Sequence, residues 1–377
     1  MSERPDLVVT AGRLFCADTG LDGPGGIAIT DGRITAAGPD VSGPATRTLD
    51  FPDAILLPGL VDLHAHPAPG EWRWGIDADT MMLRRGSTTV MSQGDAGAHT
   101  WQEYRERILE PAATRIMMAL SPAVLGERHD RGLFIHLEEL DIDACVDTIE
   151  ADGGDIWGLA ANLTDIACGD NDHREVMERI LTIAERTGKP ILYGTRKTPF
   201  DWPIAEQLEL LRPGDVMTYC FIEPQESLDG DGQVVDAYWR ARERGVLFDL
   251  GLGKGTSDMG SAVAAIDQDF PPDTVSSDVY KNHSGWDPPH DLPMTISRII
   301  ACGLPETDAF AKATLRPAQI LGRAGEIGTL APGASGDLSV LRWGEDPVIL
   351  ADAPDNDREG GALQPVVTVR AGEVYEP

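Results

Sequence analysis

Eight short apolar stretches, separated by stretches with helical character, constrain the fold of this chain more than any other feature. They are Leu60–Leu63, Thr88–Met91, Arg115–Leu120, Asp155–Ala160, Pro190–Tyr193, Asp215–Cys220, Val246–Leu250 and Thr274–Asp278. The clearest intervening helix covers 174–187, where Val176, Ile180 and Ile183 recur at helical spacing before Gly188 ends it. Strands that alternate with helices form parallel sheets, so eight such units predict an α/β protein with a (β/α)8 TIM barrel.

Both ends of the chain read as β-structure without helices. The first 57 residues contain short strand-like stretches separated by turn signals such as Asp22-Gly23 and Asp31-Gly32. The tail returns to strand character over 325–330, 336–341 and 366–372. Neither end is long enough for a complete sheet alone. We therefore predict a small composite β-sandwich domain built from residues 1–57 and 323–377, beside a barrel that covers 58–322.

The charge balance limits the partners of the protein. The 377 residues contain 62 acidic and 31 basic side chains, a formal net charge of −31. Such a surface repels nucleic acid and anionic membranes, so we expect neither as a partner. A composition rich in Asp and poor in Lys resembles proteins of salt-accumulating halophiles. A GC-rich genome would also explain the shortage of Lys, but it explains the acidic excess less well.

The cysteines and the N-terminus predict a cytoplasmic protein. The five cysteines are scattered, odd in number and without a Cys-x-x-Cys pair, which fits reduced thiols. The first residues lack the basic and apolar regions of a secretory signal, and no apolar run reaches about 18 residues. The sequence does not indicate an oligomeric state, and a homodimer is the default expectation.

A pair of histidines follows the first barrel strand. Alternate residues of a strand point to the same side, so His64 and His66 project together beyond Leu60–Leu63. Two converging imidazoles form half of a metal site, because neutral imidazole suits zinc and similar ions. The alternative is two unrelated surface histidines in a loop. The apolar strand before the pair and the turn at Pro58-Gly59 favour the metal site.

Several motifs of the chain resemble the amidohydrolase superfamily, and most of all its dihydroorotase/deacetylase-like branch. The motifs are Pro58–His66 at the first strand, Leu211–Phe221 around the sixth, Pro272–Asp278 at the eighth, and the closing segments Ala313–Ala318 and Gly328–Leu338. The resemblance spans nearly the whole chain. It implies a barrel with a composite β-sandwich, a metal centre at the C-terminal face of the barrel, and hydrolysis of amides, cyclic amides or esters.

The same resemblance implies a set of metal ligands, which this chain holds only in part. The paired histidines of the first strand are present, and so is the aspartate of the eighth strand, Asp278. Ala160 matches the position of a carboxylated lysine, and Tyr193 and Tyr219 match the histidines of strands five and six. Leu252 matches a histidine often found after strand seven. A bridged two-metal site is therefore not expected.

The remaining ligands predict a single divalent metal ion, with zinc as the first choice. His64, His66 and Asp278 would hold it, and two histidines with one carboxylate leave a position open for water. Asp278 is also the predicted base. We predict catalytic roles for Tyr193 and Tyr219, whose hydroxyls could donate to a developing oxyanion. The alternative is that both tyrosines only fill the space of lost ligands.

Charged residues that follow the barrel strands are candidates for binding the substrate. Arg196 and Lys197 follow strand five and could pair with a substrate carboxylate. His283 and His290 follow strand eight and could supply a ligand, an acid or a base, because histidine titrates near neutral pH. The alternative for both pairs is that they are solvated loop residues.

Three functions fit these residues. The first is a metal-dependent hydrolase that cleaves a C–N bond (amide or cyclic amide) or an ester bond of a small molecule. The second is a degenerate barrel that has lost metal hydrolysis and binds a small molecule or performs metal-free chemistry through Tyr193 and Tyr219. The third is a scaffold without activity, which explains the retained His64, His66 and Asp278 least well.

Overall fold

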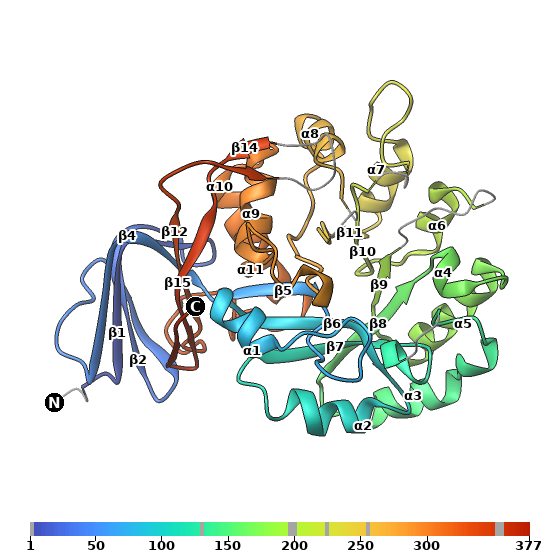
Figure 1. Cartoon of the computed structure of the whole chain (residues 1–377), viewed down its shortest axis with the longest axis horizontal. Helices are drawn as coiled ribbons and strands as arrows, with labels where there is room; N and C mark the ends of the chain where they lie inside the picture. Colours follow the sequence, from blue (N-terminus) through green and yellow to red (C-terminus); the bar gives the residue numbers. More distant parts are fainter. Residues whose placement is uncertain (1–3, 129–131, 195–201, 223–225, 254–256, 351–357) are drawn as a thin grey trace.

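The structure of the chain is a computed structural model that describes residues 4–128, 132–194, 202–222, 226–253, 257–350 and 358–377. Figure 1 shows a β-rich body, which includes the N-terminal strands, beside a ring of strands surrounded by helices. The predicted fold class is confirmed, because a curled parallel sheet and a separate mixed sheet are both present.

Seven parallel strands form the barrel sheet, and their order in space is their order in the chain. They are β5 (Leu60–Ala65), β6 (Ser87–Gly97), β7 (Arg115–Ser121), β8 (Ile156–Asn162), β9 (Ile191–Gly194), β10 (Val216–Met217) and β11 (Leu247–Phe248). Parallel neighbours need a crossover connection, which the helices between them supply. The carboxyl ends of all seven strands therefore meet at one face of the sheet, where barrel active sites lie.

The eighth predicted strand, 274–278, is not a regular strand, although it closes the ring. Parallel bridges join Asp249 to Thr274 on one side and Ala65 to Val279 on the other. Backbone hydrogen bonds accompany both bridges: Leu250 N donates to the Thr274 carbonyl, and His66 N donates to the Val279 carbonyl (3.0 and 3.1 Å). Asp278 has a φ of 47°, which interrupts the extended conformation at this point.

Helices connect the strands and cover the outside of the barrel (Figure 1). They are α1 (Ala78–Met81), α2 (Trp101–Tyr104), α3 (Ile142–Ala151), α4 (Asp165–Cys168), α5 (His173–Thr187), α6 (Ile204–Leu210), α7 (Asp236–Glu243), α8 (Met259–Asp267), α9 (Leu292–Ala301), α10 (Glu306–Lys312) and α11 (Leu315–Ile320). The helix predicted over 174–187 is confirmed as α5. The Asp172 side chain accepts a hydrogen bond from Arg174 N at its start, and Gly188, with a φ of 65°, follows its end.

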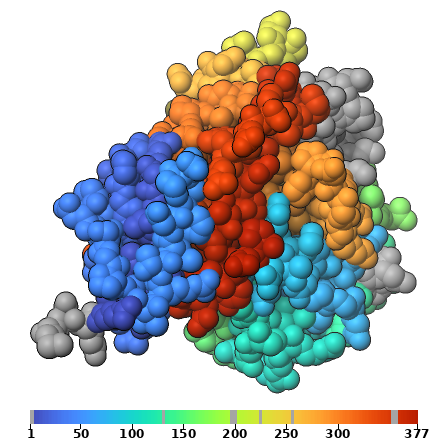
Figure 2. All heavy atoms as spheres, turned by 60° about the vertical axis from the view of Figure 1, so that its left-hand side comes forward, coloured from blue at the N-terminus to red at the C-terminus, as the bar shows by residue number. Residues whose placement is uncertain are grey.

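A second sheet of seven strands combines both ends of the chain. Its strands are β1 (Leu7–Cys16), β2 (Leu21–Thr30), β3 (Arg33–Gly38), β4 (Arg47–Pro58), β12 (Leu338–Trp343), β15 (Leu363–Arg370) and β16 (Glu373–Tyr375). A separate hairpin contains β13 (Val348–Leu350) and β14 (Arg358–Gly360). Within the seven-stranded sheet β12 pairs with β4, so the C-terminal strands lie between the N-terminal strands and the barrel (Figure 2). The predicted strand at 325–330 is wrong, since only a bridge between Ala324 and Ile327 forms there.

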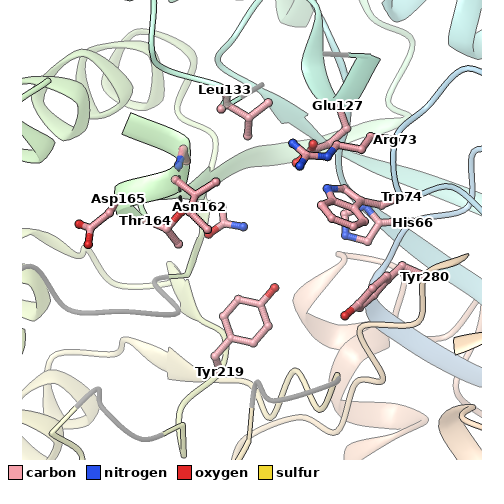
Figure 3. A pocket seen from close by; sticks show the side chains of 13 residues that line it. His66, Arg73, Trp74, Glu127, Leu133, Asn162, Thr164, Asp165, Tyr219 and Tyr280 are labelled. Carbon is pink, nitrogen blue, oxygen red and sulfur yellow. Dashed lines mark hydrogen bonds between the residues drawn. The ribbon is translucent and has the colours of Figure 1, made fainter. Parts of the chain in front are cut away.

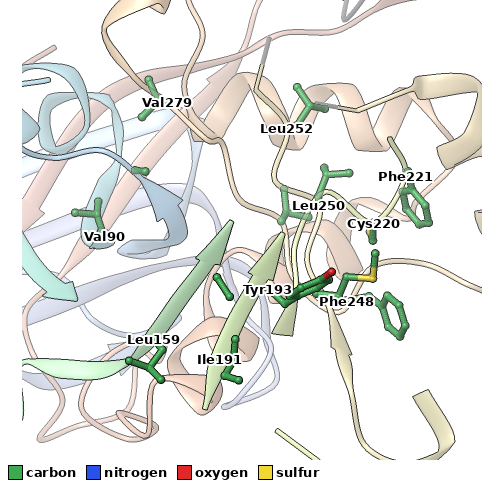
Figure 4. Close-up of a cluster of buried hydrophobic side chains, with 14 of the residues drawn as sticks. Val90, Leu159, Ile191, Tyr193, Cys220, Phe221, Phe248, Leu250, Leu252 and Val279 are labelled. Carbon is green, nitrogen blue, oxygen red and sulfur yellow. The ribbon is translucent and has the colours of Figure 1, made fainter. Parts of the chain in front are cut away.

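Strand β4 of the second sheet ends at Pro58, and strand β5 of the barrel begins at Leu60, so no linker separates the two domains. The domain boundaries therefore stay a prediction. Apolar side chains from neighbouring strands pack into a large buried cluster that includes Leu159, Ile191 and Phe248 (Figure 4). Burial of such side chains supplies most of the stabilisation of a domain of this kind. Within the described part of the chain, the helices are too short or too polar to cross a membrane.

A buried carboxylate, Asp337, connects the composite sheet to the barrel. It precedes β12 and accepts hydrogen bonds from the Arg115 guanidinium on β7 (2.8 Å), the Ala371 backbone N–H (2.8 Å) and the Ser335 hydroxyl (2.7 Å). Asp337 is 3% exposed. The ion pair with Arg115 is therefore shielded from water, which makes the loss of either charge costly.

We expect Asp337→Asn to lower the free energy of unfolding by about 2–3 kcal/mol, because it removes the buried carboxylate that pairs with the largely buried guanidinium groups of Arg115 and Arg370. Urea denaturation of the wild type and the variant measures this change. The exposed Asp346 provides the control, and Asp346→Asn should change the value by less than about 0.5 kcal/mol. Equal effects of the two substitutions would contradict the connecting role of Asp337.

Candidate functional site

Two histidines and one aspartate converge at the C-terminal face of the barrel. His64 lies on β5, His66 follows it, and Asp278 lies in the segment that closes the ring. The Oδ1 atom of Asp278 is 3.3 Å from His64 Nε2 and 3.7 Å from His66 Nε2. One donor atom from each residue lies within 4.8 Å of the others, and all three residues are buried. The structure thus brings together the three residues that the sequence predicts as metal ligands.

A hydrogen bond to Thr218, which directly follows β10, orients the ring of His64. The Thr218 hydroxyl donates to Asp249 Oδ2 (2.8 Å) and so presents a lone pair to His64 Nδ1 at 2.9 Å. His64 Nδ1 must therefore carry the proton and donate it to Thr218. Asp249 also accepts from the hydroxyls of Thr274 and Ser276, which holds the carboxylate in place. The Nε2 lone pair of His64 is consequently directed at the group that contains Asp278.

A carboxylate orients His66 in the same way. His66 Nδ1 lies 2.8 Å from Asp95 Oδ1, and the Ser92 hydroxyl donates to the other oxygen of Asp95 (2.7 Å). Burial lowers the pKa of His66, but the nearby carboxylates of Asp95 and Asp278 outweigh it and raise the pKa overall. A histidine that donates Nδ1–H to a carboxylate and offers Nε2 is the usual arrangement of a metal-ligating imidazole.

A cavity of about 420 Å³ opens beside this group (Figure 3). Its walls combine aromatic and apolar side chains with a few polar ones. The lining residues are His66, Arg73, Trp74, Glu127, Gly132, Leu133, Asn162, Thr164, Asp165, Ile166, Ala167, Tyr219 and Tyr280. A mostly apolar pocket with a few converging polar groups is typical of a small-molecule site.

Tyr219 reaches into this cavity, and its hydroxyl lies beside the histidine pair. The hydroxyl is 3.1 Å from His64 Nε2, and the ring packs against the imidazole with centroids 4.9 Å apart. Because His64 carries its proton on Nδ1, the Tyr219 hydroxyl donates to Nε2. Tyr219 has a φ of 61°, an uncommon conformation for a bulky residue, and such conformations cluster at functional sites. Figure 3 shows the hydroxyl directed into the cavity.

The structure does not bring Tyr193 to the site. Its hydroxyl donates to the Gln207 side chain on α6, and its ring lies in the apolar cluster of Figure 4. Burial raises the pKa of this hydroxyl well above its usual value. The next residue of β9, Gly194, faces the opposite side of the strand, where it lies against the side chains of Tyr219 and Thr218. The position of Tyr193 favours a packing role over the predicted catalytic one.

The other predicted site residues lie apart from the group of His64, His66 and Asp278, or they lie outside the described residues. Arg196 and Lys197 lie outside the described residues. His283 is buried, its Nδ1 accepts a hydrogen bond from Tyr280 N (3.2 Å), and it is not among the described residues that line the cavity. Ala160 and Leu252 are buried among apolar side chains, as expected for positions that have lost a ligand.

The residues that orient the histidines were not predicted from the sequence. Asp95 follows a strand-like stretch of the sequence, so a carboxylate near the carboxyl end of that strand could have been predicted. Thr218 and Asp249, which follow β10 and β11, carried no such signal, because only the folded barrel brings Thr218 against both His64 and Asp249. Glu127 lies in a short 3-10 helix after β7 and Asn162 ends β8, and only the folded barrel brings the two into one cavity wall.

Glu127 is a buried carboxyl group in the cavity wall, only 6% exposed. Burial raises its pKa to about 7, although the charges of His66 and Arg73 lower it in part. An acid whose pKa is higher in the folded state binds its proton more tightly there. The folded state is therefore favoured at low pH and loses this advantage as the pH rises through the shifted pKa.

We expect the wild type to lose stability relative to Glu127→Gln as the pH rises from about 4.5 to about 7, with a constant difference above that range. The full change is on the order of 3 kcal/mol, because the pKa rises from 4.5 to about 7. Urea denaturation of both proteins at about pH 5 and about pH 8 measures it. The exposed Glu178 on α5 is the control, and Glu178→Gln should show no such pH dependence. A difference between wild type and Glu127→Gln that is equal at both pH values would contradict the shift.

Relatives of known name and solved structures resemble the chain over most of its length, although no family model matches it. Deacetylase Atu3266 of Agrobacterium fabrum is 28% identical over 301 residues, which cover 77% of this chain and 72% of the relative. A deacetylase of Brucella anthropi is 27% identical over 357 residues, which cover 92% of this chain and 83% of the relative.

The solved structures support the same fold. A crystal structure of an adenine deaminase matches with a TM-score of 0.89 and 23% identity, covering 99% of this chain and 100% of the other. A crystal structure of a dihydroorotase matches with a TM-score of 0.85 and 24% identity, covering 99% of both chains. These matches show that the chain shares the fold of both proteins, and the named relatives agree with the resemblance to the amidohydrolase superfamily seen in the sequence.

Proposed function

We propose that this protein is a metal-dependent hydrolase that cleaves a C–N bond (amide or cyclic amide) or an ester bond of a small molecule at a single metal ion. The observation that carries this proposal is the convergence of His64 Nε2, His66 Nε2 and Asp278 Oδ1 beside a cavity. The names of the relatives, which are deacetylases, support the cleavage of an amide bond.

The three residues fit a divalent ion. Both Nδ1 atoms are engaged by Thr218 and Asp95, so each ring offers only its Nε2 lone pair to the group. Two imidazoles and a carboxylate match the preference of zinc, which we propose as the ion. Such an ion, when bound, acidifies a water molecule and polarises a carbonyl oxygen.

The side chains around the proposed ion site can act as the base, donate to the oxyanion and exclude water. Asp278 directs one carboxylate oxygen into the same space as the two Nε2 atoms and can accept the proton of an attacking water with the other. The Tyr219 hydroxyl, directed into the cavity, can donate to the oxyanion that develops on the substrate. The aromatic rings of Trp74 and Tyr280 help to exclude water from the substrate.

One observation favours the alternative of a barrel without a metal. The Tyr219 hydroxyl donates to His64 Nε2, which is the lone pair that an ion would need. In that case the cavity would bind a small molecule, and Tyr219 would keep His64 neutral instead of serving an oxyanion. Metal analysis separates the two functions.

We expect about one divalent ion per chain after purification without chelators, and none in His66→Ala, because two ligands do not retain the ion. Elemental analysis by plasma mass spectrometry measures both. The buffer should contain high salt, since the acidic composition suggests a halophilic origin. The exposed His99 is the control, and His99→Ala should retain the metal. A wild type that neither contains nor takes up metal would support the alternative function.

We expect Tyr219→Phe to lower kcat by about 10²–10³ and to leave the metal content unchanged, because it removes one donor to the oxyanion. The assay uses the best substrate from a screen of amides, lactams and esters. Tyr193→Phe removes the same atom from a ring that faces α6 and should change kcat by less than about threefold. Equal losses in both variants would contradict the role of Tyr219.

A further inference from the structure

Asp278, one of the three proposed metal ligands, has an unusual backbone conformation. Its φ of 47° lies in the left-handed region, which residues with side chains visit rarely. Such a conformation persists only where the surroundings hold it in place. The φ angle of Asp278 describes how its Cα atom is rotated relative to the peptide group that joins Ser277 to Asp278. The orientation of this peptide group therefore determines the direction of the Asp278 side chain.

This peptide group is held at both of its polar ends. Its N–H, that of Asp278, donates to the backbone carbonyl of His64 (2.8 Å). Its carbonyl, that of Ser277, lies 2.7 Å from His290 Nε2. The Ser277 residue itself is anchored by Asp62, which accepts from both its backbone N–H (3.0 Å) and its hydroxyl (2.5 Å).

A buried arginine determines which nitrogen of His290 carries the proton. Arg298 Nη1 on α9 lies 2.8 Å from His290 Nδ1. A guanidinium can only donate, so Nδ1 must accept and Nε2 must carry the hydrogen that is donated to Ser277. Burial and the charge of Arg298 both lower the pKa of His290, which keeps the ring neutral, as this arrangement requires. The ring of His283 stacks on that of His290 with centroids 4.0 Å apart and restrains its plane.

We propose that Arg298 and His290 are positioning residues that hold the Ser277–Asp278 peptide group and thereby direct the Asp278 carboxylate at His64 and His66. The inference rests on the proposed function, because a correctly directed Asp278 completes the metal site. His290 lies outside the set of ligands and acts on the ion only through Asp278. Partners of this kind affect metal affinity by about 10–100-fold when they are removed.

Two substitutions at His290 separate hydrogen bonding from packing. His290→Phe keeps a flat ring against His283 but loses the bond to Ser277 and the acceptor for Arg298. His290→Gln has an N–H₂ group that can donate to Ser277 and an oxygen that can accept from Arg298. His283→Phe is the matched control, since it alters the same stack without touching the Ser277–Asp278 peptide group.

The first measurement is the affinity of the full-length variants for Zn²⁺, by competition with a chromogenic chelator, with thermal unfolding of the metal-free proteins beside it. We expect His290→Phe to raise the Kd about 10–100-fold, and His290→Gln and His283→Phe to stay within about threefold of the wild type. A His290→Phe variant with wild-type affinity would overturn the proposal. So would a His290→Gln variant that is folded but as weak as His290→Phe.

Crystal structures of the metal-free wild type and His290→Phe keep this test separate from that of the proposed function. We expect the Ser277–Asp278 peptide group to rotate in His290→Phe, with Asp278 leaving the left-handed region and its carboxylate turning from the histidines. An unchanged peptide group would overturn the positioning role. A wild type without affinity for Zn²⁺ that still shows this rotation would overturn the proposed function while supporting the role of His290.

Discussion

The hydrogen bonds to the two Nδ1 atoms are the interactions on which the candidate site depends. Thr218 and Asp95 each take one Nδ1–H, so that His64 and His66 present Nε2 to the same small volume. Without these partners a buried imidazole could choose either tautomer, and two histidines near one another would not make a site. The barrel supplies the partners because β6 and β10 bring their carboxyl ends to the face where β5 ends.

Much of this arrangement follows from local sequence. The strand and helix rhythm predicts the barrel, because burial on both sides makes the strands apolar and the helices amphipathic. The alternation along β5 predicts that His64 and His66 converge. The pattern of 274–278 predicts an eighth strand, but only the resemblance to known proteins predicts Asp278 as a ligand, and its φ of 47° shows that the segment is not a regular strand.

The direction of the Tyr193 side chain could not be predicted from the sequence. Strand β9 has only four residues, all buried, so no polar alternation reveals which side chains face the helices. Matching by resemblance placed Tyr193 at the position of a ligand, whereas the folded chain directs its hydroxyl at Gln207 on α6. The partners Thr218 and Asp249 were unreadable for a related reason, because their role arises from contacts between residues far apart in the chain.

The shape of the site explains why we propose one metal ion and not two. Tyr219 and Gly194 occupy the region beside His64 together: a Cβ atom at residue 194 would lie 2.9 Å from the Tyr219 ring. A ligand-bearing side chain at residue 194 and the tyrosine therefore exclude each other. The face of β9 towards Tyr219 supplies no ligand, and Ala160 on β8 supplies none either. The Tyr219 ring fills the space beside His64, and its hydroxyl, which donates to His64 Nε2, is directed into the cavity.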